Sequence, residues 1–142
     1  MKLNEAIRAA QKIKSDCDFL MEQTGFDGYT FDKIETKNLS ADERFLFDRL
    51  VKALDGLDIF VGAIDYISRP IKFEGTLRKN ERGRHECEAR EYTSGCTIEY
   101  QTYDDFDERD EWQLSRVEHN GNDYYIVADR DLSLDGLRVR VR

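Results

Sequence analysis

The second half of this chain is a series of short segments in which apolar and polar residues alternate, separated by turn residues. In the first segment, Ile71, Phe73 and Leu77 share one face, and charged or polar residues occupy the other. This period of two is typical of a strand with one buried face. Similar runs occupy residues 84–90, 96–100, 112–119, 124–128 and 137–142. Six short strands in about 70 residues predict a small, strongly bent antiparallel β-barrel of the SH3-like kind.

The turn residues between these runs also carry information. Asn120-Gly121 predicts a β-hairpin, because Asn and Gly tolerate the positive φ angles that tight hairpin turns require. In the first arm of this hairpin Leu114 and Val117 are three residues apart, so they cannot share one face of a regular strand. We therefore expect a β-bulge between them.

The first half of the chain has the helical period instead. Apolar residues recur every three or four positions, which predicts helices over about residues 2–23 and 41–68. Ser40 and Glu43 form a capping-box pattern at the start of the second helix, and Pro70 ends it. The composition changes at residues 68–70 without a flexible linker. We therefore expect an α+β protein, with an antiparallel helical hairpin in residues 1–69 and the barrel in residues 70–142.

Two amphipathic helices cannot cover both of their apolar stripes by packing on each other alone. The stripes must therefore pack on the barrel or on another chain. We expect residues 1–69 to form a homodimer or a larger homo-oligomer.

Net charge restricts the possible partners. The chain of 142 residues carries a net charge of −8, which argues against direct binding to nucleic-acid phosphates. Residues 104–111 hold six acids and one arginine and are expected to form an acidic loop. The loop is interpreted either as a solvated turn or as an anionic surface that imitates nucleic-acid phosphates and captures a basic partner. The partner-binding candidates in it are Asp104, Asp105, Asp107, Glu108, Asp110 and Glu111.

Aromatic residues near this loop add to the candidate surface. Tyr124 and Tyr125 are adjacent in a predicted strand, so one of them must face outward. An exposed Tyr or Trp112 beside Arg116 would suit a peptide or protein partner. The three arginines of residues 137–142 are interpreted as the solvated face of an edge strand, with a nucleic-acid-binding stripe as the alternative.

Metal and catalytic sites are weakly indicated. His85, Cys87, Cys96 and His119 could complete a zinc site if barrel closure brought them together, and Cys96 with His119 could act as nucleophile and base. Buried thiols explain the cysteines better, because no Cys-x-x-Cys spacing is present. We expect no metal, no cofactor and no enzymatic activity. The unpaired thiols, the lack of a membrane-length apolar run and the charged N-terminal stretch predict a cytoplasmic protein without a membrane anchor.

The order of the motifs from residue 75 onward resembles a known family. The pieces are Gly75-x-Leu77, Gly83-Arg84-His85-Glu86, Tyr92-Thr93-Ser94-Gly95 with Ile98-Glu99, Trp112, Arg116-Val117-Glu118, Asp123-Tyr124-Tyr125-Ile126-Val127 and Leu134-x-Gly136-Leu137-x-Val139-Arg140. Together they resemble the small bacterial domain of unknown function numbered 5348. The resemblance implies an origin in Firmicutes and their mobile elements or phages, and it implies no catalytic residues.

The function expected from these observations is a non-enzymatic protein-interaction protein of a bacterial mobile element or phage. The alternative is a phage-type inhibitor of a host defence system. Such an inhibitor would act as an anti-CRISPR-like acidic nucleic-acid mimic or would sequester a nucleotide signal with its aromatic and arginine residues.

Overall fold

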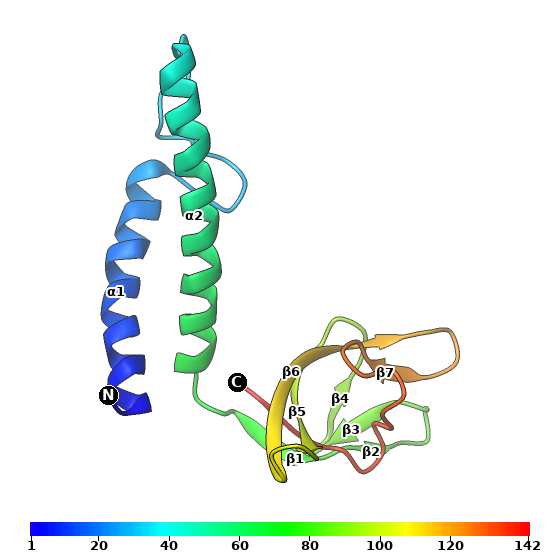
Figure 1. Ribbon diagram of the computed structural model, residues 1–142. Coiled ribbons are helices and arrows are strands. Elements are labelled where there is room, and N and C mark those ends of the chain that lie inside the picture. Colours follow the sequence, from blue (N-terminus) through cyan, green and yellow to red (C-terminus); the bar gives the residue numbers. More distant parts are fainter. The chain divides into compact units, whose positions relative to one another are not determined.

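The chain folds into two compact units, a helical unit (Met1–Arg69) and a β unit (Pro70–Arg142), in a computed structural model that describes residues 1–142 (Figure 1). The helical unit holds two α-helices, and the β unit holds eight strands in two antiparallel sheets. The predicted α+β class is therefore confirmed.

Local sequence signals explain where the two helices begin and end. Helix α1 (Leu3–Thr24) stops at Gly25, which adopts the left-handed conformation with a φ of 65°. Helix α2 (Ala41–Ser68) starts after Ser40. The Ser40 hydroxyl accepts a hydrogen bond from the Glu43 amide at 3.3 Å, and the Glu43 carboxylate accepts one from the Ser40 amide at 2.8 Å. The predicted capping box is confirmed.

Helices α1 and α2 lie side by side and run antiparallel (Figure 1). Gln11 donates a hydrogen bond of 2.9 Å to the Ser68 hydroxyl, and Lys14 Nζ lies 3.2 Å from an Asp65 carboxylate oxygen. The contact residue in α2 therefore moves toward the start of that helix as the contact residue in α1 moves toward its end, which is the pattern of an antiparallel pair. The few buried apolar side chains between the helices are Cys17, Leu54, Val61 and Ile64.

Aromatic side chains tie the connecting loop to α2. The ring of Phe31 stacks on Phe26 at 4.8 Å and meets Phe47 edge-on at 5.5 Å between centroids. This cluster supports the part of α2 that continues past the end of α1. Neither helix combines the length and the hydropathy of a membrane-spanning segment.

The β unit contains two sheets. Its strands are β1 (Phe73–Thr76), β2 (Arg78–Lys79), β3 (His85–Cys87), β4 (Arg90–Tyr92), β5 (Thr97–Asp104), β6 (Arg109–His119), β7 (Tyr124–Ile126) and β8 (Arg138–Val141). The five-stranded sheet has the order β1-β8-β5-β6-β7, and the three-stranded sheet has the order β2-β3-β4. The strands do not close into a single barrel.

The prediction of six strands was wrong because two of the alternating runs are each divided. The first run breaks at Leu77, whose amide donates to Leu137 and whose carbonyl accepts from Gly136. At this residue the chain leaves one sheet and enters the other. The second run breaks at Glu88 and Ala89, which both have positive φ and form a turn between β3 and β4. The alternation of apolar and polar residues in the sequence continues through such breaks, so the pattern alone does not reveal where one strand ends and the next begins.

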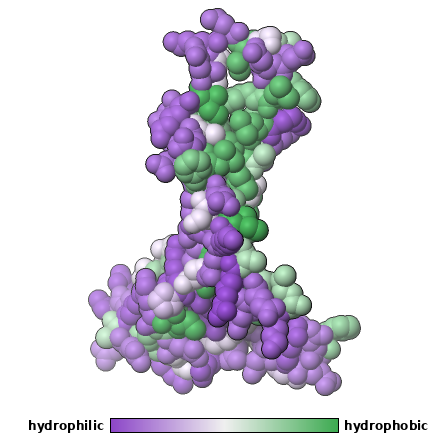
Figure 2. Space-filling view, turned by 90° about the vertical axis from the view of Figure 1, so that its left-hand side faces the viewer, coloured by the Kyte–Doolittle hydropathy of each residue, from purple (hydrophilic) through white to green (hydrophobic).

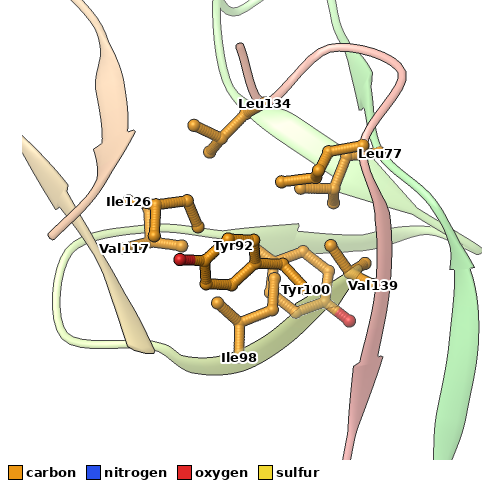
Figure 3. Close-up of a cluster of buried hydrophobic side chains, with 9 residues drawn as sticks. Leu77, Tyr92, Ile98, Tyr100, Val117, Ile126, Leu134 and Val139 are labelled. Carbon is orange, nitrogen blue, oxygen red and sulfur yellow. The ribbon is translucent and has the colours of Figure 1, made fainter. Parts of the chain in front are cut away.

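Both sheets contribute to a single apolar core (Figure 3). Its buried side chains are Leu77, Tyr92, Ile98, Tyr100, Val117, Ile126, Leu134, Leu137 and Val139. Gly75 is needed beside this core, because a Cβ atom there would meet the Cys87 sulfur at 2.5 Å. The core fixes which face of β5 and β6 remains outside.

Two details of the predicted second hairpin differ in the structure. The register between β5 and β6 is regular, so the expected bulge is absent. Val117 is buried in the core, whereas Leu114 lies on the opposite, exposed face. A regular strand therefore accommodates both residues without a bulge. The hairpin itself is present, but its turn spans residues 120–123, because His119 pairs with Tyr124. Gly121 has a φ of 98° in this turn.

Strand β8 is not the edge strand that we expected. It lies between β1 and β5, and its alternating arginines form ion pairs instead of a solvated stripe. Arg138 pairs with Glu74, while Arg140 and Arg142 both pair with Glu99. These carboxylates neutralise the basic stripe that the sequence suggested.

Candidate partner-binding surface

The acidic segment is mostly strand. Residues of β5 and β6 pair without interruption from Thr97 opposite Arg116 to Asp104 opposite Arg109. Only residues 105–108 form the turn, whereas the sequence predicted a loop over residues 104–111. The regular pairing gives the acids defined positions on a two-stranded ribbon.

Hydrogen bonds within the turn hold its backbone. One carboxylate oxygen of Asp104 accepts from the amides of Phe106 at 2.8 Å and Asp107 at 3.2 Å. Arg109 pairs with Asp107 at 2.7 Å, and Glu108 adopts a φ of 49°. Two of the six candidate acids thus maintain the turn, and their carboxylates are already engaged.

Phe106 is the most exposed part of this turn. Its side chain is 94% exposed, at the centre of the acidic segment. Asp105, Glu108 and Asp110 are also exposed and form no ion pair. Sequence reasoning missed Phe106, although one large apolar residue among six acids was a visible signal. The result is an aromatic side chain presented from an anionic turn.

The exposed sheet face continues from this turn along β6. Because side chains alternate, Trp112, Leu114 and Arg116 lie on the face opposite the core residue Val117. Tyr125 of β7 pairs with Glu118 of β6. Glu118 lies on the same face as Arg116, so Tyr125 lies on that face as well. Leu114 is exposed, and Trp112 and Tyr125 are half-buried. The structure thus brings Trp112, Arg116 and Tyr125 onto one surface, as the sequence suggested.

Tyr124 does not belong to that surface. Its ring lies edge-on to His85 at 6.4 Å and to His119 at 4.7 Å. It packs against the core, whereas the Tyr125 ring receives the guanidinium of Arg130 at 5.4 Å. Of the adjacent tyrosines, Tyr125 is the outward one.

A charged cluster supports Trp112. The guanidinium carbon of Arg140 lies 4.1 Å from the centre of the Trp112 ring, a cation–π contact. Arg140 is also ion-paired with the buried carboxylate of Glu99, which accepts a further hydrogen bond from Arg142 at 2.7 Å. Because Glu99 pairs with both Arg140 and Leu114, this cluster lies on the same face as Trp112 and holds its ring there.

The four zinc candidates do not form a site. No group of three or more His, Cys, Asp or Glu side chains is placed to hold a metal ion. His85 is buried, and Cys87 and Cys96 pack against the core as free thiols. His119 Nδ1 instead accepts a hydrogen bond from the Gly121 amide at 3.0 Å.

His85 is electrostatically unusual even without a metal. Burial lowers its pKa below the ordinary histidine value of 6.5. Its Nδ1 atom has no hydrogen-bond partner. The nearby Asp123 has a lowered pKa of its own, chiefly because Lys79 donates a hydrogen bond to it. His85 is buried, so it is not part of the exposed face.

Comparison with known families agrees with the resemblance seen in the sequence. Fold and surface define a two-part α+β protein whose β unit presents an aromatic and acidic face. Residues 75–141, which lie within this unit, match the family described as Domain of unknown function (DUF5348). No curated protein and no solved structure matches the chain. The resemblance predicted for the second half of the chain is thus confirmed.

Proposed function

We propose that this protein is a non-enzymatic interaction protein whose β5–β6 hairpin binds another protein. The single observation that carries the proposal is the 94% exposure of Phe106 on a turn held by its own hydrogen bonds. An aromatic side chain supplies a large contact area with few rotatable bonds. Because the turn is already ordered, little further conformational entropy is lost on binding.

Charge around Phe106 specifies the partner. Asp105, Glu108 and Asp110 are exposed without ion pairs. A complementary surface would offer an apolar pocket surrounded by lysine and arginine. Such opposite charges accelerate association and orient the two proteins.

The adjoining sheet face extends this surface. Trp112, Leu114, Arg116 and Tyr125 would form contacts beyond the Phe106 pocket, and Trp and Arg often contribute strongly to binding energy. Trp112 is held in place by Arg140. We therefore propose that Phe106 makes the main contact with the partner and that this face makes additional, weaker contacts.

A nucleic-acid mimic that inhibits a host defence system is the second candidate function. The unpaired acids Asp105, Glu108 and Asp110 favour it, because they could replace phosphates in a basic groove. The other observations favour a protein pocket. Asp104 and Asp107 are engaged inside the turn, and Phe106 has no counterpart in a phosphate backbone. Sequestration of a nucleotide by Trp112 and Arg140 is less favourable, since Glu99 already pairs with Arg140.

Three further expectations remain proposals. The first is an SH3-like relationship of the β unit, supported by two small sheets that share one core. The second is action in the bacterial cytoplasm from a gene of a mobile element or phage, as the resemblance implies. The third is homo-oligomerisation through the helical unit, supported by the large apolar side chains that its helices expose.

Comparative capture from a Firmicutes lysate tests the proposal. The immobilised full chain, a Phe106→Ser variant and a Tyr29→Ser control would be compared by quantitative mass spectrometry. Tyr29 is as exposed as Phe106 but lies in the helical unit. We expect a protein that the wild type and the control retain and the Phe106 variant loses. Identical sets of retained proteins for all three chains would contradict the proposal.

A nuclease-treated lysate and a DNA competitor separate the two candidate functions. A partner that the chain competes away from DNA would favour mimicry. A partner without affinity for DNA would favour the protein-pocket function.

A further inference from the structure

The helical unit has two unlike sides, and one ion pair identifies them. Cys17 in α1 and Val61 in α2 are buried and point between the helices. At about 100° per residue, Lys14 lies about 60° to one side of Cys17, and Asp65 lies about 40° to the same side of Val61. Lys14 and Asp65 meet at 3.2 Å. Turning from Cys17 toward Lys14 on α1, and from Val61 toward Asp65 on α2, therefore leads to the same side of the helix pair.

The opposite sense of rotation leads to apolar residues on both helices. Ile13 and Leu20 lie about 40° and 60° from Cys17 in this direction, and Leu57 lies about 40° from Val61. We call this surface the apolar face. It comprises Ala6, Ile13, Leu20, Leu46, Leu50, Ala53, Leu57, Phe60 and Ile67. Figure 2 shows hydrophobic residues gathered over the helices.

Much of the apolar face is open to solvent. Ile13 is 55% exposed and Ile67 is 44% exposed, and Leu20, Leu46 and Leu50 are exposed as well. The middle of the face holds no ionisable side chain, but Asp16 and Asp42 share the angle of Phe60 at its edge, and Arg49 shares that of Ile67. Two copies of this acidic chain would therefore meet through an uncharged middle, with charges of both signs at the edges.

The total surface of the chain is larger than two compact bodies of its mass would expose. Two separate compact bodies of about 8.4 kDa each would together expose about 9,200 Å². The chain, of 16.7 kDa, exposes 10207 Å². The excess of about 1,000 Å² belongs to the whole chain, and the exposed apolar side chains of the helices contribute to it. A standard interface buries roughly 800 Å² on each partner.

We propose that the apolar face binds the apolar face of a second copy of this chain, giving a two-fold symmetric four-helix bundle. A helix pair with one apolar side is self-complementary under a two-fold axis, because the same patch serves both subunits. Two such pairs enclose a core that one pair cannot enclose. This inference rests on the proposed homo-oligomerisation, and it specifies the face and the symmetry.

Matched lysine substitutions on the two sides of the same helices test the inference. The face variant carries Ile13→Lys and Ile67→Lys. The control variant carries Phe19→Lys and Ile59→Lys, because these residues are 63% and 75% exposed but point away from the other helix. Sedimentation velocity of the full chains over a concentration series gives the dissociation constants, and circular dichroism checks the helices.

We expect a wild-type dimer, a control dimer of similar affinity, and a face variant whose dissociation constant rises by at least about a hundredfold. If the lysine pair reduces helicity, Ile13→Gln with Ile67→Gln replaces it. An oligomer that survives the face substitutions but not the control ones would overturn the inference and leave homo-oligomerisation intact. A monomeric wild type would overturn both and would leave the face to a different protein, without affecting the role proposed for Phe106.

Discussion

The Asp104 carboxylate accepts a hydrogen bond of 2.8 Å from the backbone amide of Phe106. The same Asp104 oxygen accepts a second hydrogen bond, from the backbone amide of Asp107. One side chain therefore orders the turn that presents the exposed aromatic ring, so the turn is shaped before any partner arrives.

Replacing Asp104 should loosen the turn without unfolding the β unit. In Asp104→Ala the amides of Phe106 and Asp107 lose their acceptor, and we expect them to exchange hydrogen several times faster. Hydrogen–deuterium exchange measures this. Asp105→Ala is the control, because the Asp105 carboxylate holds no amide of the turn. Equal exchange in both variants would show that Asp104 does not order the turn.

Removing the Glu99 carboxylate should destabilise the β unit. Glu99→Gln leaves Arg140 and Arg142 partly buried without their counter-charge, which should cost roughly 2–4 kcal/mol in the free energy of unfolding. The fluorescence of Trp112, the single tryptophan, reports unfolding in denaturant.

Glu118→Gln is the matched control for Glu99. Glu118 pairs with Arg116 at the surface, where an ion pair contributes at most about 1 kcal/mol. Equal losses of stability in the two variants would mean that burial of Glu99 is unimportant.

His85 should make the β unit less stable in mild acid. Its pKa in the folded chain lies below the unfolded value of 6.5, so the unfolded chain takes up a proton first as the pH falls. The stability due to neutral His85 is complete above about pH 6.5 and declines below it. The lowered pKa of Asp123 matters only below its ordinary value of 3.8.

Denaturation midpoints at pH 7.5 and 5.5 measure this effect. We expect the wild-type midpoint to fall at the lower pH and the midpoint of His85→Leu, which cannot titrate, to change much less. An unchanged pH dependence in His85→Leu would assign the effect to another group.

Chelator treatment should leave the thermal midpoint unchanged. His85, Cys87, Cys96 and His119 each have a place in the core or in a turn, and none of them needs a metal there. Elemental analysis of the purified chain should find no stoichiometric zinc. A melting temperature that falls with chelator and recovers with zinc would contradict this prediction.

Short-range patterns predicted the elements of this fold better than their assembly. The capping box of Ser40 and Glu43 and the left-handed Gly25 depend on neighbouring residues, so the sequence revealed the helix ends. The division of the first β run at Leu77 depends on hydrogen bonds to residues 136 and 137, about 60 positions away. The central position of β8 likewise depends on its pairing with β1 and β5. Such long-range pairings leave no local signal.

The candidate surface was also predicted only as far as local patterns allow. Alternation correctly separated Tyr124 from Tyr125, but only the core contacts of Tyr124 showed which one faces outward. Phe106 escaped notice because an apolar residue in a predicted loop was read together with its charged neighbours. Its exposure became evident once strand pairing reduced the expected loop to four residues.

Binding kinetics of the captured partner test the central claim most directly. Surface plasmon resonance would compare the wild type, Phe106→Ser, and a variant in which Asp104, Asp105, Asp107, Glu108, Asp110 and Glu111 are changed to Asn or Gln. We predict that Phe106→Ser accelerates dissociation by tenfold or more, about 1.4 kcal/mol. The neutralised variant should melt nearly as the wild type but associate more slowly and with less dependence on salt. Unchanged dissociation for Phe106→Ser, with unchanged association for the neutralised variant, would contradict the account and transfer the binding role to Trp112, Arg116 and Tyr125.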